Sequence, residues 1–207
     1  SYNNIGVVYM AIDEYDKAYE YFNKALSISK EKFGEHHREV SICYTNIGNY
    51  FAKTGNPDKA LEFYNKALTI DLDIIGEEHA EVARFDINLI GGVYSDKGDQ
   101  LKALEYYRKS LKIMHVTLGD KHPYVAETYQ GFGLVYERLK DYNTALRYYQ
   151  KSIVSLLAEF NNSSIYTNPK PDLLEKRKAT SSKPHLLEAF INKAEGFEKY
   201  YYYKKKK

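Results

Sequence analysis

The chain has 207 residues, 43% of them hydrophobic, and its 30 basic and 28 acidic residues give a net charge of +2. This balance of charges gives no strong positive electrostatic potential that would attract a polyanion, so nucleic acid is not an expected partner. The single cysteine, Cys43, excludes an intrachain disulfide and favours a reducing, cytoplasmic location. No apolar run approaches the ~18 residues that would span a membrane.

One phrase of about 42 residues recurs four times along the chain. Its anchoring glycines, Gly6, Gly48, Gly91 and Gly133, are 42, 43 and 42 positions apart, and each is followed twelve positions later by an alanine and then by an aromatic pair. Such a period indicates stacked units, because one unit cannot bury its apolar face alone. The phrase is already under way at Ser1, so we expect a piece of a longer polypeptide.

The second unit shows what each phrase encodes. Its apolar residues recur at helical spacing over 38–54 and again over 57–74, which predicts two antiparallel helices. Gly55 suits the positive φ of the turn, Asn56 suits the N-cap and Pro57 suits the first helical position. We expect Gly48 and Ala60 to face each other where the two helices approach closely.

The junctions between units carry a second signature, a glycine followed two or three positions later by a histidine. The glycine is expected to end one unit's second helix, and the polar residues with the histidine to open the next first helix. The third unit has one extra residue between Val82 and Gly91. This insertion predicts either a π-type bulge or a lengthened helix start near Arg84–Ile87.

These residues resemble the tetratricopeptide repeat, and the Ala103–Ser110 phrase resembles the repeats of kinesin light chains. The resemblance implies an all-α fold, a right-handed α-solenoid of helix hairpins. It covers residues 1–158, divided into units 1–33, 34–75, 76–118 and 119–158. The first of these units is truncated.

The remaining residues do not repeat. Residues 159–185, rich in Asn, Ser, Pro and Lys, are expected to form an irregular linker with a short helix at 172–178. Residues 186–203 recover helical spacing and predict a helix that caps the array, while 204–207 form a basic tail. The segments 153–160, 164–169 and 186–195 resemble the region after the repeats in bacterial proteins that carry a caspase-like CHAT domain.

The tetratricopeptide resemblance implies that the first helices line a concave binding face. The polar positions expected there are Asn3, Asn4, Thr45, Asn46, Asn49, Lys53, Asn88, Asp96, Glu127, Gln130 and Arg138, with Leu134 beside them. Asparagine both donates and accepts hydrogen bonds, so a row of asparagines can bracket an extended peptide backbone. The alternative is a solvated polar face without a ligand.

Other functions find little support in the residues. The basic clamp with which some tetratricopeptide arrays hold a C-terminal carboxylate is absent, since Asn3, Phe85 and Leu89 stand at its positions. The repeated tyrosines are expected in the core rather than on a stacking surface. His37, His79 and His122 occur once per unit, too far apart for one metal ion. Cys43 is expected to be a buried thiol.

We therefore expect a non-catalytic scaffold that binds a protein or peptide, with no cofactor and no metal. Two other roles remain open. The chain could regulate a CHAT-type cysteine protease whose catalytic domain lies elsewhere, or it could be a cargo adaptor of the kinesin-light-chain kind. Exposed ends of the array are also expected to allow weak self-association.

Overall fold

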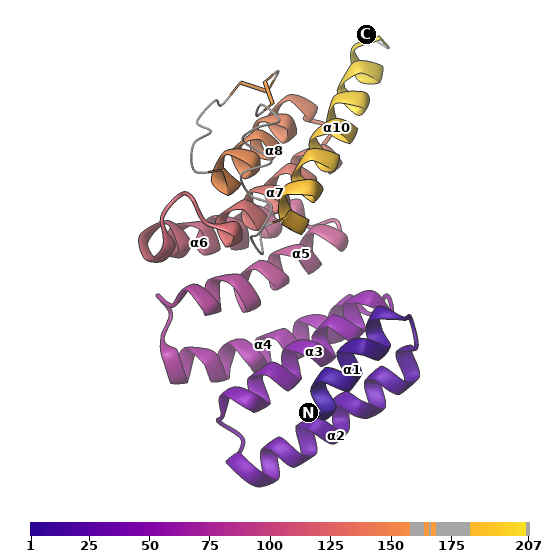
Figure 1. The fold of residues 1–207 in the computed structure, drawn as a ribbon, viewed down its shortest axis with the longest axis vertical. Helices are drawn as coiled ribbons and strands as arrows, with labels where there is room; N and C mark the ends of the chain where they lie inside the picture. The colour runs from indigo at the N-terminus through magenta and orange to yellow at the C-terminus, as the bar shows by residue number, and fades with distance from the viewer. Residues whose placement is uncertain (158–163, 166, 169–182, 206–207) are drawn as a thin grey trace. The chain divides into compact units, whose positions relative to one another are not determined.

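In the computed structural model, residues 1–157, 164, 165, 167, 168 and 183–205 are described, and no strand occurs among them. Helices follow one another along this part of the chain (Figure 1). They are α1 (Tyr2–Ala11), α2 (Tyr15–Phe33), α3 (Arg38–Lys53), α4 (Pro57–Ile75), the π-helix η1 (Val82–Ile87), α5 (Asn88–Asp96), α6 (Gln100–Leu118), α7 (Pro123–Arg138), α8 (Tyr142–Leu156) and α10 (Lys183–Lys205). The prediction of an all-α fold is confirmed.

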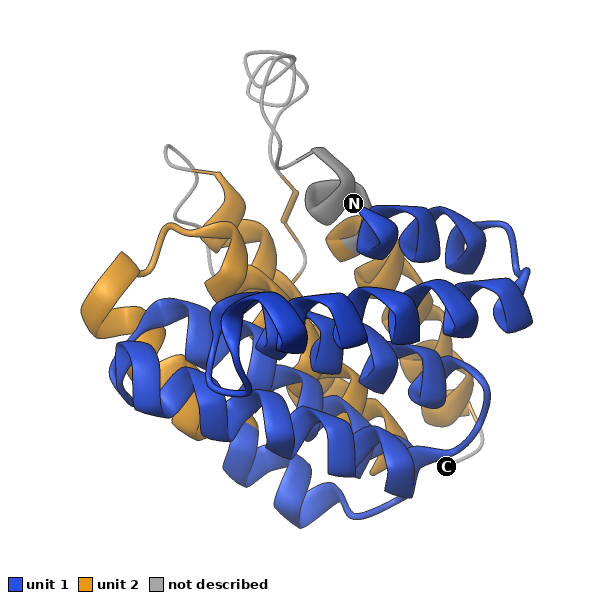
Figure 2. Cartoon of the chain, turned by 90° about the horizontal axis from the view of Figure 1, so that it is seen from below, with its two compact units in different colours: residues 1–106 blue, residues 107–207 orange. Residues whose placement is uncertain are grey.

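The chain divides into two compact units, residues 1–106 and 107–207 (Figure 2). The division falls inside α6. The first unit contains the hairpins α1–α2 and α3–α4, followed by η1, α5 and the start of α6. The second unit contains the rest of α6, the hairpin α7–α8 and α10. Each unit is described by itself below.

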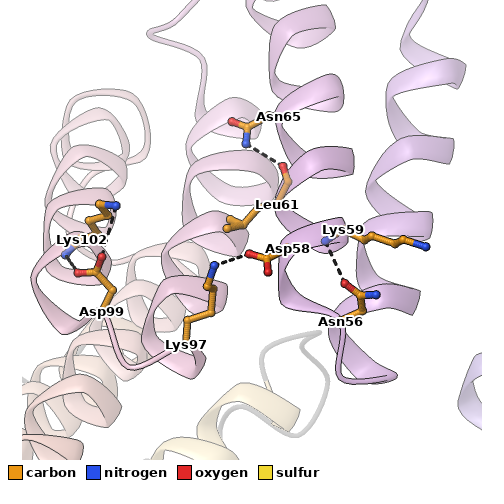
Figure 3. Close-up of polar contacts among 8 residues, drawn as sticks. All are labelled: Asn56, Asp58, Lys59, Leu61, Asn65, Lys97, Asp99 and Lys102. Atoms are coloured by element: carbon orange, nitrogen blue, oxygen red, sulfur yellow. Dashed lines mark hydrogen bonds and ion pairs between the residues drawn. The ribbon is translucent and has the colours of Figure 1, made fainter.

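The turn between α3 and α4 follows its sequence signals closely. Gly55 has a φ of 79°, the Asn56 side chain accepts a hydrogen bond from the Lys59 amide at 3.2 Å, and Pro57 stands in the first turn of α4. Figure 3 shows this cap and, beside it, an ion pair between Asp58 on α4 and Lys97 at the end of α5. The predicted turn is confirmed residue by residue.

The anchoring glycines Gly6, Gly48 and Gly133 each make room for an aromatic ring. A Cβ added to Gly48 would lie 2.5 Å from the ring of Tyr64, and one added to Gly6 would lie 2.5 Å from Phe22. The expectation that Gly48 and Ala60 face each other stays a prediction, and the nearest neighbour of Gly48 is the ring of Tyr64. Tyr64 stands one helical turn after Ala60, and helical side chains lean toward the N-terminus, so its ring extends back along the helix to the glycine.

A second aromatic contact recurs in each hairpin, between one ring on the first helix and one on the second. Ring centroids are 5.3–5.4 Å apart and the planes lie within 20° of parallel. The pairs are Tyr9–Tyr21, Phe51–Phe63, Tyr94–Tyr106 and Tyr136–Tyr148. The tyrosines that face the glycines, Tyr64 and Tyr149, are buried, as expected of core residues.

The extra residue of the third unit is absorbed by η1. One residue inserted in an α-helix would rotate everything beyond it by about 100°. The π-helical turn over Val82–Ile87 takes up this rotation, so Val82 at its start and Ile90 after it are both fully buried. The prediction of a π-type bulge is confirmed.

The junction histidines act as N-caps. Nδ1 of His37 accepts a hydrogen bond from the Glu39 amide at 3.1 Å, and Nδ1 of His122 accepts one from Tyr124 at 3.2 Å. The preceding glycines have φ between 74° and 84°, which L-residues with side chains rarely adopt. These contacts give the recurring glycine and histidine a structural role at helix boundaries.

In the second unit, α10 packs against α8 and α7. Ala189 on α10 is fully buried in a cluster with Ala126, Ile153 and Leu156. The helix begins at Lys183 and continues to Lys205, two residues into the segment predicted as a tail. Most of the predicted linker 159–185, including the expected short helix at 172–178, lies outside the described residues.

Candidate functional site

The residues predicted to bind a partner all lie on the first helices of the hairpins. Asn3 and Asn4 lie on α1, Thr45, Asn46, Asn49 and Lys53 on α3, Asn88 and Asp96 on α5, and Glu127, Gln130, Leu134 and Arg138 on α7. We call the members in the first unit the first-helix face: Asn3, Asn4, Thr45, Asn46, Asn49, Lys53, Asn88 and Asp96.

Two asparagines connect successive first helices. The Asn46 amide donates to the Asn3 carbonyl oxygen at 2.9 Å, and Asn3 is only 8% exposed. Asn4, the next residue on α1, is exposed, and Asn46 is half-buried. The structure thus brings side chains 43 positions apart into one row of carboxamides across α1 and α3.

Two other predicted residues on α3 are engaged within their own hairpin. The Tyr64 hydroxyl donates to the carbonyl oxygen of Asn49 at 2.7 Å, and the Thr45 hydroxyl donates to the backbone oxygen of Ser41 at 3.1 Å. Burial raises the pKa of Tyr64, so its hydroxyl keeps its proton and remains a donor. Asn49 therefore has a structural role as well as its position on the first-helix face.

The charges on the first-helix face alternate from one helix to the next. Lys53 on α3 and Asp96 on α5 both stand five positions after the anchoring glycine, and both are exposed. A face with one charge of each sign at the equivalent position has no strong preference for an acidic or a basic ligand.

Two exposed apolar side chains lie on the first helices; the sequence placed Phe85 only at a position of the absent basic clamp and did not single out Ile42. Ile42 and Phe85 each stand six positions before the anchoring glycine, and they are 38% and 40% exposed. The Arg84 guanidinium lies 4.3 Å from the centre of the Phe85 ring. Their equivalent positions in the repeat were the signal that could have identified them.

In the second unit, the predicted position Gln130 is only 5% exposed. Its amide donates to the Ser152 hydroxyl at 3.4 Å, and its carbonyl oxygen accepts from Asn192 on α10 at 3.3 Å. Glu127 is half-buried, and Arg138 is exposed at the end of α7. A ligand could reach Gln130 only by displacing α10.

The family model of the tetratricopeptide repeat matches residues 1–73 and 81–153. The chain belongs to the tetratricopeptide repeat family. A comparison with curated proteins gave no match.

Solved structures with tetratricopeptide repeats have a similar fold. BtubC (BKLC) from P. vanneervenii is 20% identical, with a TM-score of 0.64 over 94% of this chain and 72% of that one. A protein described as a kinesin light chain of Podosopora anserina, with nearly identical TPR-like repeats, is 13% identical, with a TM-score of 0.66 over 96% and 84% of the two chains. The predicted likeness to kinesin-light-chain-type repeats is confirmed.

Tetratricopeptide repeats generally form scaffolds for protein interaction. No group of three or more His, Cys, Asp or Glu side chains arranged to hold a metal ion occurs among the described residues. In the same residues, no helix has the length and apolar character needed to cross a membrane. Cys43 is buried beside Ser29, and burial raises the pKa of its thiol, as expected for an inert core cysteine.

Two buried ionisable groups, one in the tetratricopeptide array and one on α10, were not anticipated. Asp86 lies within η1 with no exposed surface, and Lys193 on α10 is 3% exposed. The Lys193 ammonium donates to side-chain oxygens of Gln150 at 2.7 Å and Asn168 at 2.8 Å, and to the backbone oxygen of Thr167 at 2.8 Å. Burial lowers the pKa of Lys193 to about 8.

Proposed function

We propose that this chain is a non-catalytic scaffold that binds an extended segment of a partner protein along its first-helix face. The observation that carries the proposal is the contact between Asn3 and Asn46, which aligns carboxamides from two successive repeats. A carboxamide offers both a donor and an acceptor, the two groups that an extended peptide backbone needs.

The individual side chains suit this role to different degrees. Asn4 is exposed, Asn46 is half-buried, and Asn49 has its carbonyl oxygen occupied by Tyr64 but retains an amide that can donate. The apolar side chains of Ile42 and Phe85 supply surface that hydrophobic residues of the same segment could cover. The peptide backbone would then provide affinity, and apolar side chains would provide selectivity.

A peptide display library screened against the whole chain would supply a ligand for the test. We expect the double substitution Asn4→Ala and Asn46→Ala to weaken binding of a selected peptide about tenfold or more, a change of about 1.4 kcal/mol. Isothermal titration calorimetry measures the affinity. Circular dichroism checks the fold, because Asn46→Ala leaves Asn3 without this partner.

The matched control replaces Asn23 and Asn65 with alanine. These asparagines lie on the second helices, and each donates to the backbone of its own helix at 2.7 Å. The control should bind like the wild type. Equal losses in both double variants, or no loss in either, would contradict the proposal, as would a selected peptide whose binding survives methylation of its backbone amides.

The finer roles remain predictions. A coiled coil elsewhere in the full-length protein would favour a cargo adaptor, and a His–Cys pair in an accompanying α/β domain would favour regulation of a CHAT-type protease. Cytoplasmic localisation would be tested by fractionation, and the absence of nucleic-acid binding by titration with RNA and DNA.

Weak self-association also belongs to this proposal. On α1, Ile5 is 41% exposed, whereas Ile47, the equivalent residue of α3, is fully buried. Val8 on α1 and Ile12, the residue after its end, are 61% and 60% exposed. A second copy could cover this apolar surface. Sedimentation that shows a concentration-independent monomer would contradict this part of the proposal.

A further inference from the structure

The π-helix η1 places a carboxyl group in the interior of the first unit. Asp86 has no exposed surface, and η1 packs against α4. Asp71 on α4 is half-buried, and its carboxyl group lies within hydrogen-bonding reach of Asp86. Two acidic side chains therefore face each other where a helical array normally buries apolar groups.

Among the described residues, no cationic side chain forms an ion pair with Asp86. Arg38 on α3 makes two hydrogen bonds of 2.9 Å to Glu81, just before η1. The Ser41 hydroxyl and the positive charge of Arg38 lower the pKa of Asp71, whereas the negative charge of Glu81 raises it. Arg84, on η1 itself, stacks on Phe85. Within the described residues, neither oxygen of Asp86 accepts a hydrogen bond from an N–H or O–H donor.

A carboxylate can only accept hydrogen bonds, so two ionised carboxylates cannot satisfy each other. One shared proton changes the contact into a hydrogen bond and removes the repulsion of two charges in a buried site. Burial, together with the charge and the hydrogen bond of the Asp71 carboxyl group, raises the pKa of Asp86 to about 8. Burial also raises the pKa of Asp71, while the nearby Ser41 hydroxyl, which donates to the Ala67 backbone oxygen, opposes that change.

We propose that Asp71 and Asp86 share one proton at neutral pH and that this proton holds η1 in its π-helical form against α4. Loss of the proton in alkaline solution leaves two charges facing each other, and η1 separates from α4. The pair is thus a proton-binding site that makes the third repeat sensitive to pH. This inference does not depend on the proposed peptide-binding function.

The effect on stability has a definite sign. In the unfolded chain Asp86 titrates near pH 4, whereas in the folded chain it holds its proton up to about pH 8. The folded state therefore binds more protons between these values. The stability of the folded state therefore decreases as the pH rises from about 4 to about 8. Above about pH 8, Asp86 causes no further loss of stability.

Asp86→Asn tests the proposal, because its amide can donate to Asp71 at every pH. We expect hydrogen–deuterium exchange, with rates corrected for the intrinsic effect of pH, to show that the amides of 82–87 lose protection above about pH 8 in the wild type. The same amides should stay protected in Asp86→Asn. Asp16→Asn, an exposed residue on α2, is the matched control and should behave like the wild type. Identical pH profiles in the wild type and Asp86→Asn would overturn the proposal.

A measurement on the unmodified protein covers the case in which Asp86→Asn does not fold. Carbon NMR of the aspartate carboxyl groups should show one of the pair still protonated at about pH 6. Asp71 and Asp86 should then titrate as a coupled pair. If both carboxyl groups ionise below about pH 5, like ordinary aspartates, the shared proton does not exist.

Discussion

At the scale of single residues, the same backbone conformation recurs seven positions after each anchoring glycine. Gly55 and Gly98 adopt it with φ of 79° and 84°, while Asp13 and Lys140 adopt it with φ of 60° and 62°. The left-handed region costs a residue with a Cβ about 1 kcal/mol, because the Cβ approaches the carbonyl oxygen. Two of the four hairpin turns therefore contain local strain that glycine would remove.

Lys140→Gly should relieve this strain in the fourth hairpin. We expect the free energy of unfolding to rise by about 0.5 kcal/mol, since the relief of about 1 kcal/mol is partly offset by the greater entropy of unfolded glycine. Urea denaturation measures the change.

The reciprocal substitution is Gly55→Ala, where no atom lies within 4 Å of the added Cβ and only the backbone conformation is affected. It should lower the free energy of unfolding by about 1 kcal/mol. If both variants shift stability in the same direction, the strain argument is wrong.

The features that the sequence predicted correctly depend on neighbours along the chain. The positive φ of Gly55, the cap by Asn56 and the aromatic stripe of α4 are properties of short segments. The ring that meets Gly48 was not predicted because it depends on side-chain direction: Tyr64 extends back along α4 to the glycine. Sequence patterns thus predict which face of a helix is buried more reliably than they predict which side chain of the neighbouring helix packs against it.

The candidate site was predictable to a similar extent. Repeat alignment placed the asparagines on first helices, but the contact between Asn3 and Asn46 depends on how two helices pack. The burial of Gln130 depends on α10, which follows it after a long interval of sequence. Asp86 was not anticipated because an acidic residue in a helical pattern normally indicates the exposed side. Counted back from the anchoring glycine, however, Asp86 is equivalent to Cys43 and Thr128, which are also buried.

At the scale of helices, the approach of two helices is limited by the ring that meets each glycine. A Cβ at Gly48 would meet Tyr64 at 2.5 Å, closer than any real contact, and Tyr64 is only 2% exposed. The ring cannot move without disturbing the core. Gly196 on α10 has more room, because its nearest neighbours, side-chain atoms of Leu146 and Tyr149, lie 3.2–3.4 Å away.

We therefore expect Gly48→Ala to lower the free energy of unfolding by about 1–2 kcal/mol. Overpacking costs about 1–3 kcal/mol, and the better helix propensity of alanine returns about 1 kcal/mol. Gly196→Ala, with a smaller clash and the same gain in propensity, should leave stability unchanged or slightly higher. Denaturant titration compares the two. Equal destabilisation would show that the ring contact does not limit hairpin packing.

At the scale of the whole molecule, the described residues of each compact unit include a buried ionisable group with a displaced pKa. The first unit has Asp86, whose pKa is raised to about 8, and the second has Lys193, whose pKa is lowered to about 8. The folded form of Asp86 binds the extra proton, so this group lowers stability as the pH rises from about 4 to 8. The folded form of Lys193 gives up its proton early, so this group raises stability between about pH 8 and 10.5.

Thermal unfolding followed at several pH values should separate these two contributions. We expect the melting temperature of the first unit to fall between about pH 5 and 8, and that of the second unit to rise between about pH 8 and 10. Measurements should stop near pH 10, where unfolded tyrosines ionise while buried Tyr64 and Tyr149, whose pKa values are raised by burial, do not. Asp86→Asn should abolish only the fall in melting temperature between about pH 5 and 8. Lys193→Gln should abolish only the rise in melting temperature between about pH 8 and 10. If both trends appear in one shared transition, the two units unfold as one and the assignment of each trend to one unit fails.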